Sequence, residues 1–219
     1  MPERIKVDYK VYSTTVSALE ALKELPYTIA LDFEVQSLYS NSDRIEAKEL
    51  LKQELDRPTE RFCKLVAESN GLSYPSITKI THMIIGIDES TSIVIVISNS
   101  QMEKVLLNWI VSVKHHFLLH NASFDLKQVY VKTGKFPEHY DDTQLLAKIF
   151  INHADTWKAN TQLKVLMGQY YTPKWTNIEG YDNEDLKDEA FLRYSAIDGA
   201  ATMLLWKQLQ EEVEIKKGD

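Results

Sequence analysis

Two carboxylates, Asp32 and Glu34, stand at the end of an apolar run that predicts a buried β-strand over residues 28–33. Side chains two residues apart in a strand point to the same face, so these two acids should project together. Neighbouring carboxylates repel each other, and this repulsion costs stability unless a cation or a proton neutralises them. A strand that simply ends in solvated acids would look the same, so a functional interpretation depends on further acids elsewhere in the chain.

Further acids do occur, in two predicted helices. Asp125 falls in the first turn of a helix expected over 122–132, where the helix dipole alone would also favour a carboxylate. Tyr194 and Asp198 are four residues apart in a late helix, so they share one of its faces. Each feature has a structural explanation when taken alone, but together they offer four carboxylates and a phenol.

Along the chain, the predicted secondary structure that must position these residues is mainly strands in the first half and helices in the second. An edge strand is expected within 4–12, and the runs 77–87 and 92–97 predict an antiparallel hairpin. The predicted helices are 14–24, 101–113, 122–132, 142–152, 160–170 and 186–213. This order predicts one α/β domain over residues 1–219, with a helical insertion rich in Lys, Arg and Glu at 35–76.

Composition limits the class of protein. The chain has 219 residues, of which 44% are hydrophobic and 26% charged, as in ordinary globular domains. Its net charge of −7 argues against a protein that holds nucleic acid by electrostatics alone. The single cysteine, Cys63, excludes an intrachain disulfide and a thiolate metal site. With no signal peptide and no membrane-spanning run in the sequence, we expect a cytoplasmic protein without a membrane partner.

The histidines do not predict a zinc site. Of the four candidates, two are adjacent, and none falls in a predicted helix, so no pair of them shares a helix face as zinc ligands often do. We therefore interpret them as core or surface residues. They are His115, His116, His120 and His139.

The acidic residues follow one order along the chain: Asp-x-Glu after a strand, Asn-x-x-Phe-Asp opening a helix, and Tyr-x-x-x-Asp within a late helix. This order resembles the three motifs of the DnaQ-like, or DEDD, 3′–5′ exonuclease superfamily, and the tyrosine resembles its tyrosine subgroup. The segments 140–146 and 160–166 are similar to parts of the proofreading domains of family A DNA polymerases. The resemblance covers nearly the whole chain and implies a ribonuclease H-like fold, with a mixed sheet flanked by helices.

The resemblance also implies roles for individual residues. Asp32 would bridge two divalent ions, Mg²⁺ or Mn²⁺; Glu34 and Asp198 would complete the site that holds the attacking water, and Asp125 would serve the second ion. Carboxylate oxygens are the ligands that such hard cations prefer. Tyr194, with Glu34, would orient the water. The side chains expected to touch the terminal nucleotide are Phe33, Leu38, Asn121 and Phe124.

The function implied is metal-dependent 3′–5′ hydrolysis at the 3′ end of DNA, in proofreading or end-trimming during DNA replication. An exoribonuclease of the RNase D type uses the same four acids and tyrosine, and a non-catalytic nucleic-acid-binding module would keep the fold without the chemistry. The sequence leaves open whether the domain acts alone or beside a DNA polymerase domain or subunit. It also leaves open the role of the insertion.

Overall fold

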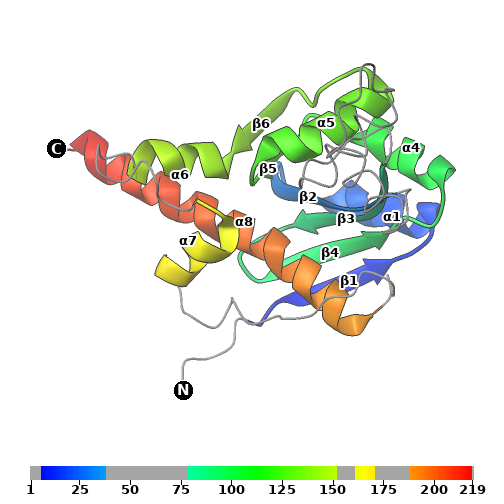
Figure 1. Cartoon of the computed structure of the whole chain (residues 1–219), viewed down its shortest axis with the longest axis horizontal. Helices are drawn as coiled ribbons and strands as arrows, with labels where there is room; N and C mark the ends of the chain where they lie inside the picture. Colours follow the sequence, from blue (N-terminus) through cyan, green and yellow to red (C-terminus); the bar gives the residue numbers. More distant parts are fainter. Residues whose placement is uncertain (1–5, 38–77, 152–160, 171–187, 219) are drawn as a thin grey trace, which may run out of the picture.

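The computed structural model describes residues 6–37, 78–151, 161–170 and 188–218, and these residues form a mixed sheet with helices on both faces (Figure 1). The sheet has six strands in the order β1-β4-β3-β2-β5-β6. They are β1 (Asp8–Tyr12), β2 (Thr28–Ser37), β3 (Thr78–Gly86), β4 (Thr91–Val96), β5 (His116–Leu119) and β6 (His139–Asp142). The predicted α/β class is confirmed.

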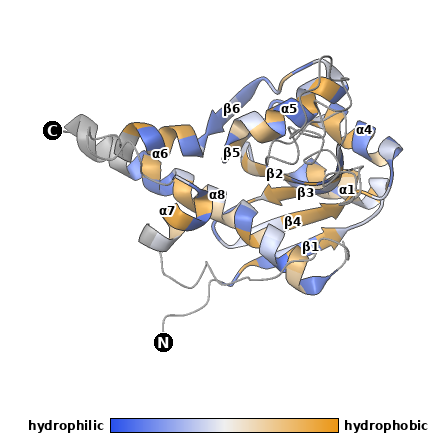
Figure 2. Ribbon diagram, viewed as in Figure 1, coloured by the Kyte–Doolittle hydropathy of each residue, from blue (hydrophilic) through white to orange (hydrophobic). Residues whose placement is uncertain are grey.

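The pairing of the strands is mixed in direction. β2 runs antiparallel to β3 and parallel to β5, while β3 and β4 form the predicted antiparallel hairpin. β1 pairs with β4 in parallel and closes one edge of the sheet, as expected for the first strand. Figure 2 shows the inner strands β3 and β4 as hydrophobic along most of their length, which fits their burial between helices.

Helices cover the two faces of the sheet differently. One face packs against α1 (Thr15–Ala21), α4 (Ser100–Ile110) and α5 (Ala122–Thr133), which share its large hydrophobic core. The long helix α8 (Glu189–Gly218) crosses the other face and contacts β2, β3 and β4. On its outer side α8 holds α6 (Thr143–Ile151) and α7 (Leu163–Tyr170), which share a separate small core with it. Among the described residues, no helix is long and apolar enough to cross a membrane.

Two glycines allow α8 to lie unusually close to the sheet. A Cβ atom on Gly86 of β3 would stand 2.3 Å from the carbonyl oxygen of Gly199 on α8. A Cβ atom on Gly199 would stand 2.8 Å from the side chain of Ile84. One turn away, the Ser92 hydroxyl donates a hydrogen bond of 2.7 Å to the carbonyl oxygen of Ala196. These contacts set the height and rotation of the helix that carries Tyr194 and Asp198.

Two predictions about elements need correction. The strand β2 continues to Ser37, so residues 35–37 of the expected helical insertion are extended; they pair with β3 after a bulge between Glu34 and Val35. Residues 38–76 of that insertion lie outside the described residues. The strand β6 was not predicted, because its His-Tyr-Asp-Asp sequence has no apolar alternation; its pairing with β5 arises from backbone hydrogen bonds.

Candidate active site

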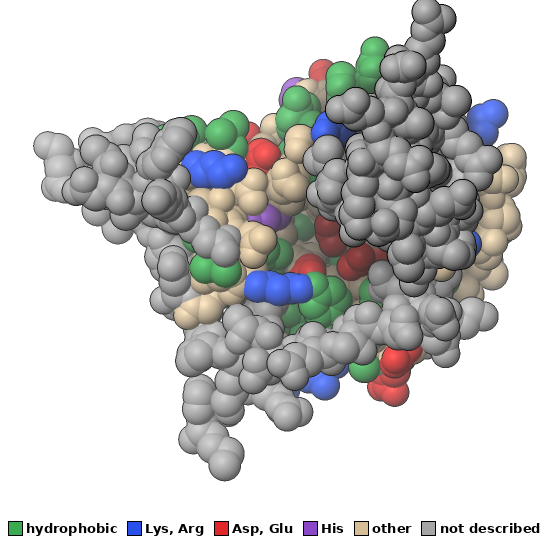
Figure 3. All heavy atoms as spheres, viewed as in Figure 1, with side chains coloured by type: hydrophobic (Ala, Val, Ile, Leu, Met, Phe, Trp, Pro, Cys, Tyr) green, Lys and Arg blue, Asp and Glu red, His purple; other side chains and the backbone are tan. Residues whose placement is uncertain are grey.

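Three carboxylates from two elements converge beside the middle of the sheet. One oxygen each of Asp32, Glu34 and Asp198 lies within 4.8 Å of the others, and all three side chains are half-buried. Figure 3 shows acidic side chains on the floor of a hollow, with a basic side chain at its rim. Asp198 is more than 160 positions from Asp32 and Glu34 in the sequence, yet the three acids meet at one site, as the resemblance implied.

The strand β2 supplies the first two acids. Asp32 and Glu34 project to the face covered by α8, and the bulge directly after Glu34 shifts the register of the pairing with β3. Phe33, between them, points to the opposite face and is 3% exposed within the main core. The expectation that the Phe33 side chain touches the terminal nucleotide is therefore wrong, because strand alternation places it in the core. Leu38 lies outside the described residues.

Asp125 stands on the first turn of α5, on the other side of β2. Its side chain is only 1% exposed, and its Oδ1 accepts a hydrogen bond of 3.0 Å from the backbone N–H of Phe33. This bond ties the start of α5 to the strand between the first two acids. The two other expected nucleotide contacts lie near it, with Asn121 exposed and Phe124 half-buried. Both of those assignments stay predictions.

Burial and mutual repulsion raise the pKa of these acids. Burial raises the pKa of Asp32 to about 6, against the opposing effects of the Phe33 N–H and the Lys164 charge. Burial, and then the charges of Asp32 and Asp198, raise the pKa of Glu34 to about 8. Burial and the charge of Asp32 also hold the pKa of Asp125 well above its usual range. The cluster binds protons tightly because burial and mutual repulsion outweigh the compensating charge of Lys164.

The donor set fits divalent ions such as Mg²⁺ or Mn²⁺. It consists of carboxylate oxygens, which hard cations prefer, and the oxygens of Asp32, Glu34 and Asp198 already lie within a few ångströms of each other. A bound cation would replace the protons that burial and repulsion otherwise favour. Asp32, Glu34 and Asp198 are the residues that would hold an ion.

This electrostatic state predicts how stability depends on pH. In the chelator-treated protein, the carboxyl groups of Asp32, Glu34 and Asp125 bind their protons more tightly when the chain is folded than when it is unfolded. Their stabilising contribution is therefore lost as pH rises from about 4 to about 8. We expect the melting temperature in EDTA to fall between pH 5.5 and 8.5. We also expect Mn²⁺ to raise it more at the higher pH.

Differential scanning fluorimetry at both values would test this expectation. Glu34→Gln should flatten the dependence on pH, whereas Glu138→Gln, at the opposite end of the sheet, should leave it unchanged. A melting temperature that rises with pH in EDTA would contradict the electrostatic account.

Asp142 is a residue of this site that the sequence did not single out. Its Oδ1 accepts hydrogen bonds from the backbone N–H groups of Asn121 at 3.1 Å, Gln144 at 2.9 Å and Leu145 at 3.3 Å. Its Oδ2 accepts from the N–H of Ala122 at 3.0 Å. One carboxylate thus caps α6 and also holds the turn that starts α5. The signal was present as the Asp-Thr segment, but its partners lie about 20 residues away and only the fold reveals them.

The turn that Asp142 holds is strained. Asn121 adopts the left-handed conformation with φ 67°, the only positive φ of a non-glycine residue among the described ones. Asparagine tolerates this conformation better than most residues do. Four residues later, the same helix presents Asp125 to Phe33. The Asp142 carboxylate therefore positions Asp125 through the backbone.

We expect Asp142→Ala to lower the free energy of unfolding by roughly 2–4 kcal/mol, because four N–H groups lose a charged acceptor. Activity should fall as well, since the start of α5 would relax. Asp142→Asn, which keeps one carbonyl acceptor, should lie between the wild type and Asp142→Ala. Urea unfolding together with steady-state rates would measure both effects; a variant as stable as the wild type would show that the capping bonds contribute little.

Three of the four histidines considered for zinc occupy two other environments. His120 is hydrogen-bonded through Nδ1 to the Thr143 hydroxyl at 2.9 Å and through Nε2 to the carbonyl oxygen of Thr161 at 3.0 Å. Its burial lowers its pKa, which favours the neutral ring. This histidine links the ends of β5 and β6 to the segment before α7.

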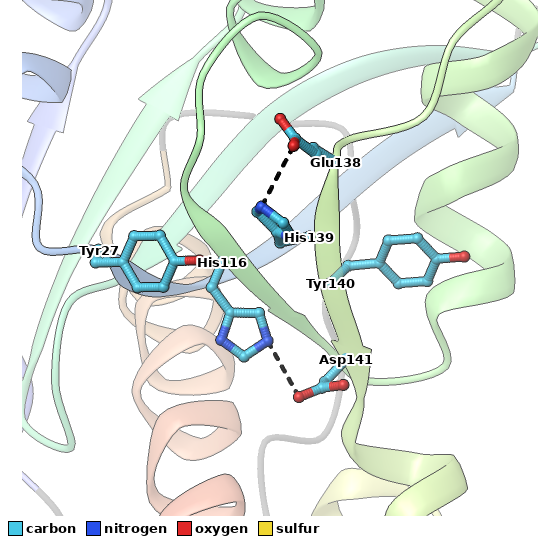
Figure 4. A pocket seen from close by; sticks show the side chains of 6 residues that line it. All are labelled: Tyr27, His116, Glu138, His139, Tyr140 and Asp141. Carbon is cyan, nitrogen blue, oxygen red and sulfur yellow. Dashed lines mark hydrogen bonds and ion pairs between the residues drawn. The ribbon is translucent and has the colours of Figure 1, made fainter.

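His116 and His139 line a pocket of about 420 Å³ at the far end of β5 and β6 (Figure 4). In that pocket Nε2 of His116 lies 3.1 Å from Asp141 Oδ2, and Tyr27 stacks on the His116 ring. Since His116 pairs in register with Thr28, the pocket lies roughly four strand residues, or about 13 Å, from Asp32. It is separate from the acidic cluster.

Comparison with known proteins adds a family match. A family model described as a 3′–5′ exonuclease matches residues 67–214 of the chain. The match includes Asp125, Tyr194 and Asp198 but begins after Asp32 and Glu34. It is the fold that brings Asp32 and Glu34 to the third acid. None of the curated proteins matches the sequence.

Several solved structures share the fold. NrnC from Brucella melitensis is 16% identical with a TM-score of 0.60, and the match covers 97% of this chain and 84% of NrnC. RNase D from Escherichia coli is 18% identical with a TM-score of 0.55, over 95% of this chain and 46% of RNase D. The RRP6 catalytic core from Trypanosoma brucei is 13% identical with a TM-score of 0.61, over 98% of this chain and 50% of that one. The chain thus spans about half the length of these last two.

Proposed function

The chain belongs to the 3′–5′ exonuclease family of the DEDD superfamily, and from this premise we propose that it releases nucleotides one at a time from the 3′ end of RNA, with divalent metal ions bound at the acidic cluster. The observation that carries the proposal is the convergence of Asp32, Glu34 and Asp198 within 4.8 Å. The family model does not reach the first two of these acids, so their position beside Asp198 is independent support for an intact catalytic site.

The choice of RNA is supported by what the similar structures contain. RNase D of Escherichia coli is described as an exoribonuclease involved in structured RNA processing, and RNase D of Trypanosoma brucei was solved with RNA U12. NrnC of Brucella melitensis was solved with pGG and with Mg²⁺. The RNA named for these relatives supports RNA as the proposed substrate of this chain.

The roles of the residues follow from the site. Hydrolysis of a phosphodiester places negative charge on the attacking and leaving oxygens, and two bound divalent ions would stabilise both. Asp32, Glu34 and Asp198 would hold the ions, and the buried Asp125 supports the strand between the first two acids through its bond to the Phe33 N–H. The Tyr194 hydroxyl, one helical turn before Asp198, orients the attacking water together with Glu34.

DNA is the second candidate substrate, because the segment around Asp142 and Thr143 resembles the corresponding part of polymerase proofreading domains. The structure gives that segment a positioning role, which would serve either nucleic acid. The expected DNA polymerase partner finds no support in the comparisons. Proofreading in DNA replication is therefore the role that we would propose if DNA is the substrate.

The deciding experiment is cleavage of 5′-labelled RNA and DNA of the same sequence, at lengths from two to twenty nucleotides. Reactions would contain Mg²⁺, Mn²⁺ or EDTA. We expect a metal-dependent ladder that shortens from the 3′ end, with RNA cleaved faster than DNA at equal length. A ladder on DNA alone would favour the second candidate, and cleavage that persists in EDTA would contradict the metal-dependent mechanism.

A further inference from the structure

A lysine from a different helix lies against the tyrosine of the site. Lys164 is the second residue of α7, and its Nζ lies 4.0 Å from the centroid of the Tyr194 ring. Both side chains are half-buried. The α7 helix reaches Tyr194 because it packs on α8 through a shared small core, which includes Leu166 and Leu205. Lys164 was not among the predicted site residues, since nothing in its local sequence marks it.

The ammonium is close enough to the acids to act on them. Its positive charge lowers the pKa of both Asp32 and Glu34, although burial outweighs this effect. Within the part of the chain that the structure describes, however, Lys164 has neither an ion pair nor a hydrogen bond; its one recorded contact is with the face of the Tyr194 ring. A ring face attracts a cation without taking up its N–H groups in ordinary hydrogen bonds.

This arrangement leaves donors available where a substrate needs them. The described site combines four carboxylates, and a nucleic acid brings more negative charge to it. A lysine that formed a salt bridge with one of these acids would have its donors occupied. Held on the ring instead, the Lys164 ammonium keeps three N–H donors next to Tyr194, the residue that the proposed function assigns to the attacking water. Lysine binds phosphate well as a point charge.

We propose that Lys164 is a substrate-binding residue whose ammonium donates a hydrogen bond to a non-bridging oxygen of the 3′-terminal phosphodiester. The inference rests on the proposed function, since it assumes that this site receives a phosphate. Tyr194 then has two roles: its hydroxyl orients water, and its ring face holds the cation that binds the phosphate. The contact favours any nucleic acid with a terminal phosphodiester, whether RNA or DNA, because it does not involve the sugar.

Two other roles predict different behaviour. If Lys164 only offsets the repulsion of the acids, its removal lowers stability in EDTA and leaves phosphate binding unchanged. If it only orients the Tyr194 ring, its removal lowers kcat and leaves the affinity for a phosphate ligand unchanged. Affinity for a single phosphate group is therefore the measurement that separates the three roles.

The test uses the full chain with Lys164→Met, which keeps the length of the side chain, and Lys164→Arg, which keeps the charge. Lys104→Met is the matched control, since Lys104 is an exposed lysine on α4, which covers the opposite face of the sheet. Binding of a nucleoside 5′-monophosphate in Mg²⁺ would be measured by calorimetry. Cleavage would be measured on an oligonucleotide and on the p-nitrophenyl ester of the same monophosphate, which has one phosphodiester.

We expect Lys164→Met to weaken monophosphate binding and to lower kcat/KM on both substrates by about 10- to 100-fold, the scale of a lost hydrogen bond to a charged group. Lys164→Arg should recover most of the loss, and Lys104→Met should match the wild type. A loss on the oligonucleotide alone, or unchanged monophosphate affinity, would overturn the proposal. A third result is that the wild type cleaves neither substrate while Lys164→Met still binds the monophosphate less tightly than the wild type does. That result would support the phosphate contact and reject the proposed function.

Discussion

Asp32→Ala should abolish exonuclease activity, with a loss of at least roughly 10³-fold in kcat, as expected when a group that stabilises transition-state charge is removed. Asp32 has the strongest electrostatic effect on the other acids. After burial, its charge is the largest cause that raises the pKa of Glu34 and of Asp125. It is also one of the three residues that would hold metal. No neighbouring side chain can take over its position on the strand.

The same substitution should make the chelator-treated protein more stable. Burial raises the pKa of Asp32 to about 6, so its ionised form destabilises the fold at pH 8. Its removal should raise the free energy of unfolding in EDTA by roughly 1–3 kcal/mol, from the size of the pKa change. Addition of Mn²⁺ should then stabilise the wild type and have little effect on the variant.

Asp8→Asn is the control for loss of one negative charge, because Asp8 is exposed on the edge strand β1. It should leave both activity and the response to Mn²⁺ unchanged. Gel assays of cleavage and thermal melts with and without metal would measure the two effects. Activity retained by Asp32→Ala would remove this residue from the mechanism, and a lower stability in EDTA would show that Asp32 makes favourable contacts that outweigh the repulsion.

Gly86→Ala should both destabilise the protein and inactivate it. The added methyl group would stand 2.3 Å from the carbonyl oxygen of Gly199, which is backbone and cannot rotate away. Overpacking of this kind costs roughly 1–3 kcal/mol. The helix α8 would have to move outward, and with it Tyr194 and Asp198, so we expect kcat to fall about 10²-fold or more, as for displaced catalytic groups.

Gly168→Ala is the matched control. Gly168 lies within α7, and among the described residues no atom beyond its own stretch of helix lies within 4 Å of a Cβ added there. Alanine should therefore be tolerated and should stabilise the helix by about 1 kcal/mol or less. Urea unfolding and steady-state kinetics of both variants would be compared. If Gly86→Ala unfolds like the wild type and keeps its activity, the close approach of α8 does not position the site.

The sequence was informative where local pattern and chemistry coincide. The edge strand β1 and the hairpin of β3 and β4 were predicted, because each strand depends on residues close together in the chain. The strand β6 was missed because a short polar segment becomes a strand only through its neighbour β5. Phe33 was misplaced as a nucleotide contact because its neighbours are acids, although strand alternation directs it into the core.

By itself, then, the sequence determined the fold class and the residue types of the site, since apolar periodicity and motif order are properties of the chain. Only the tertiary structure decided which groups act together. It brought Asp198 to Asp32 and Glu34, made Asp142 the support of the turn before Asp125, and set Lys164 on the Tyr194 ring. These contacts join residues far apart in the chain, and their distances depend on how closely α8 packs on the sheet at Gly86 and Gly199. Such distances arise from packing, which no local pattern contains.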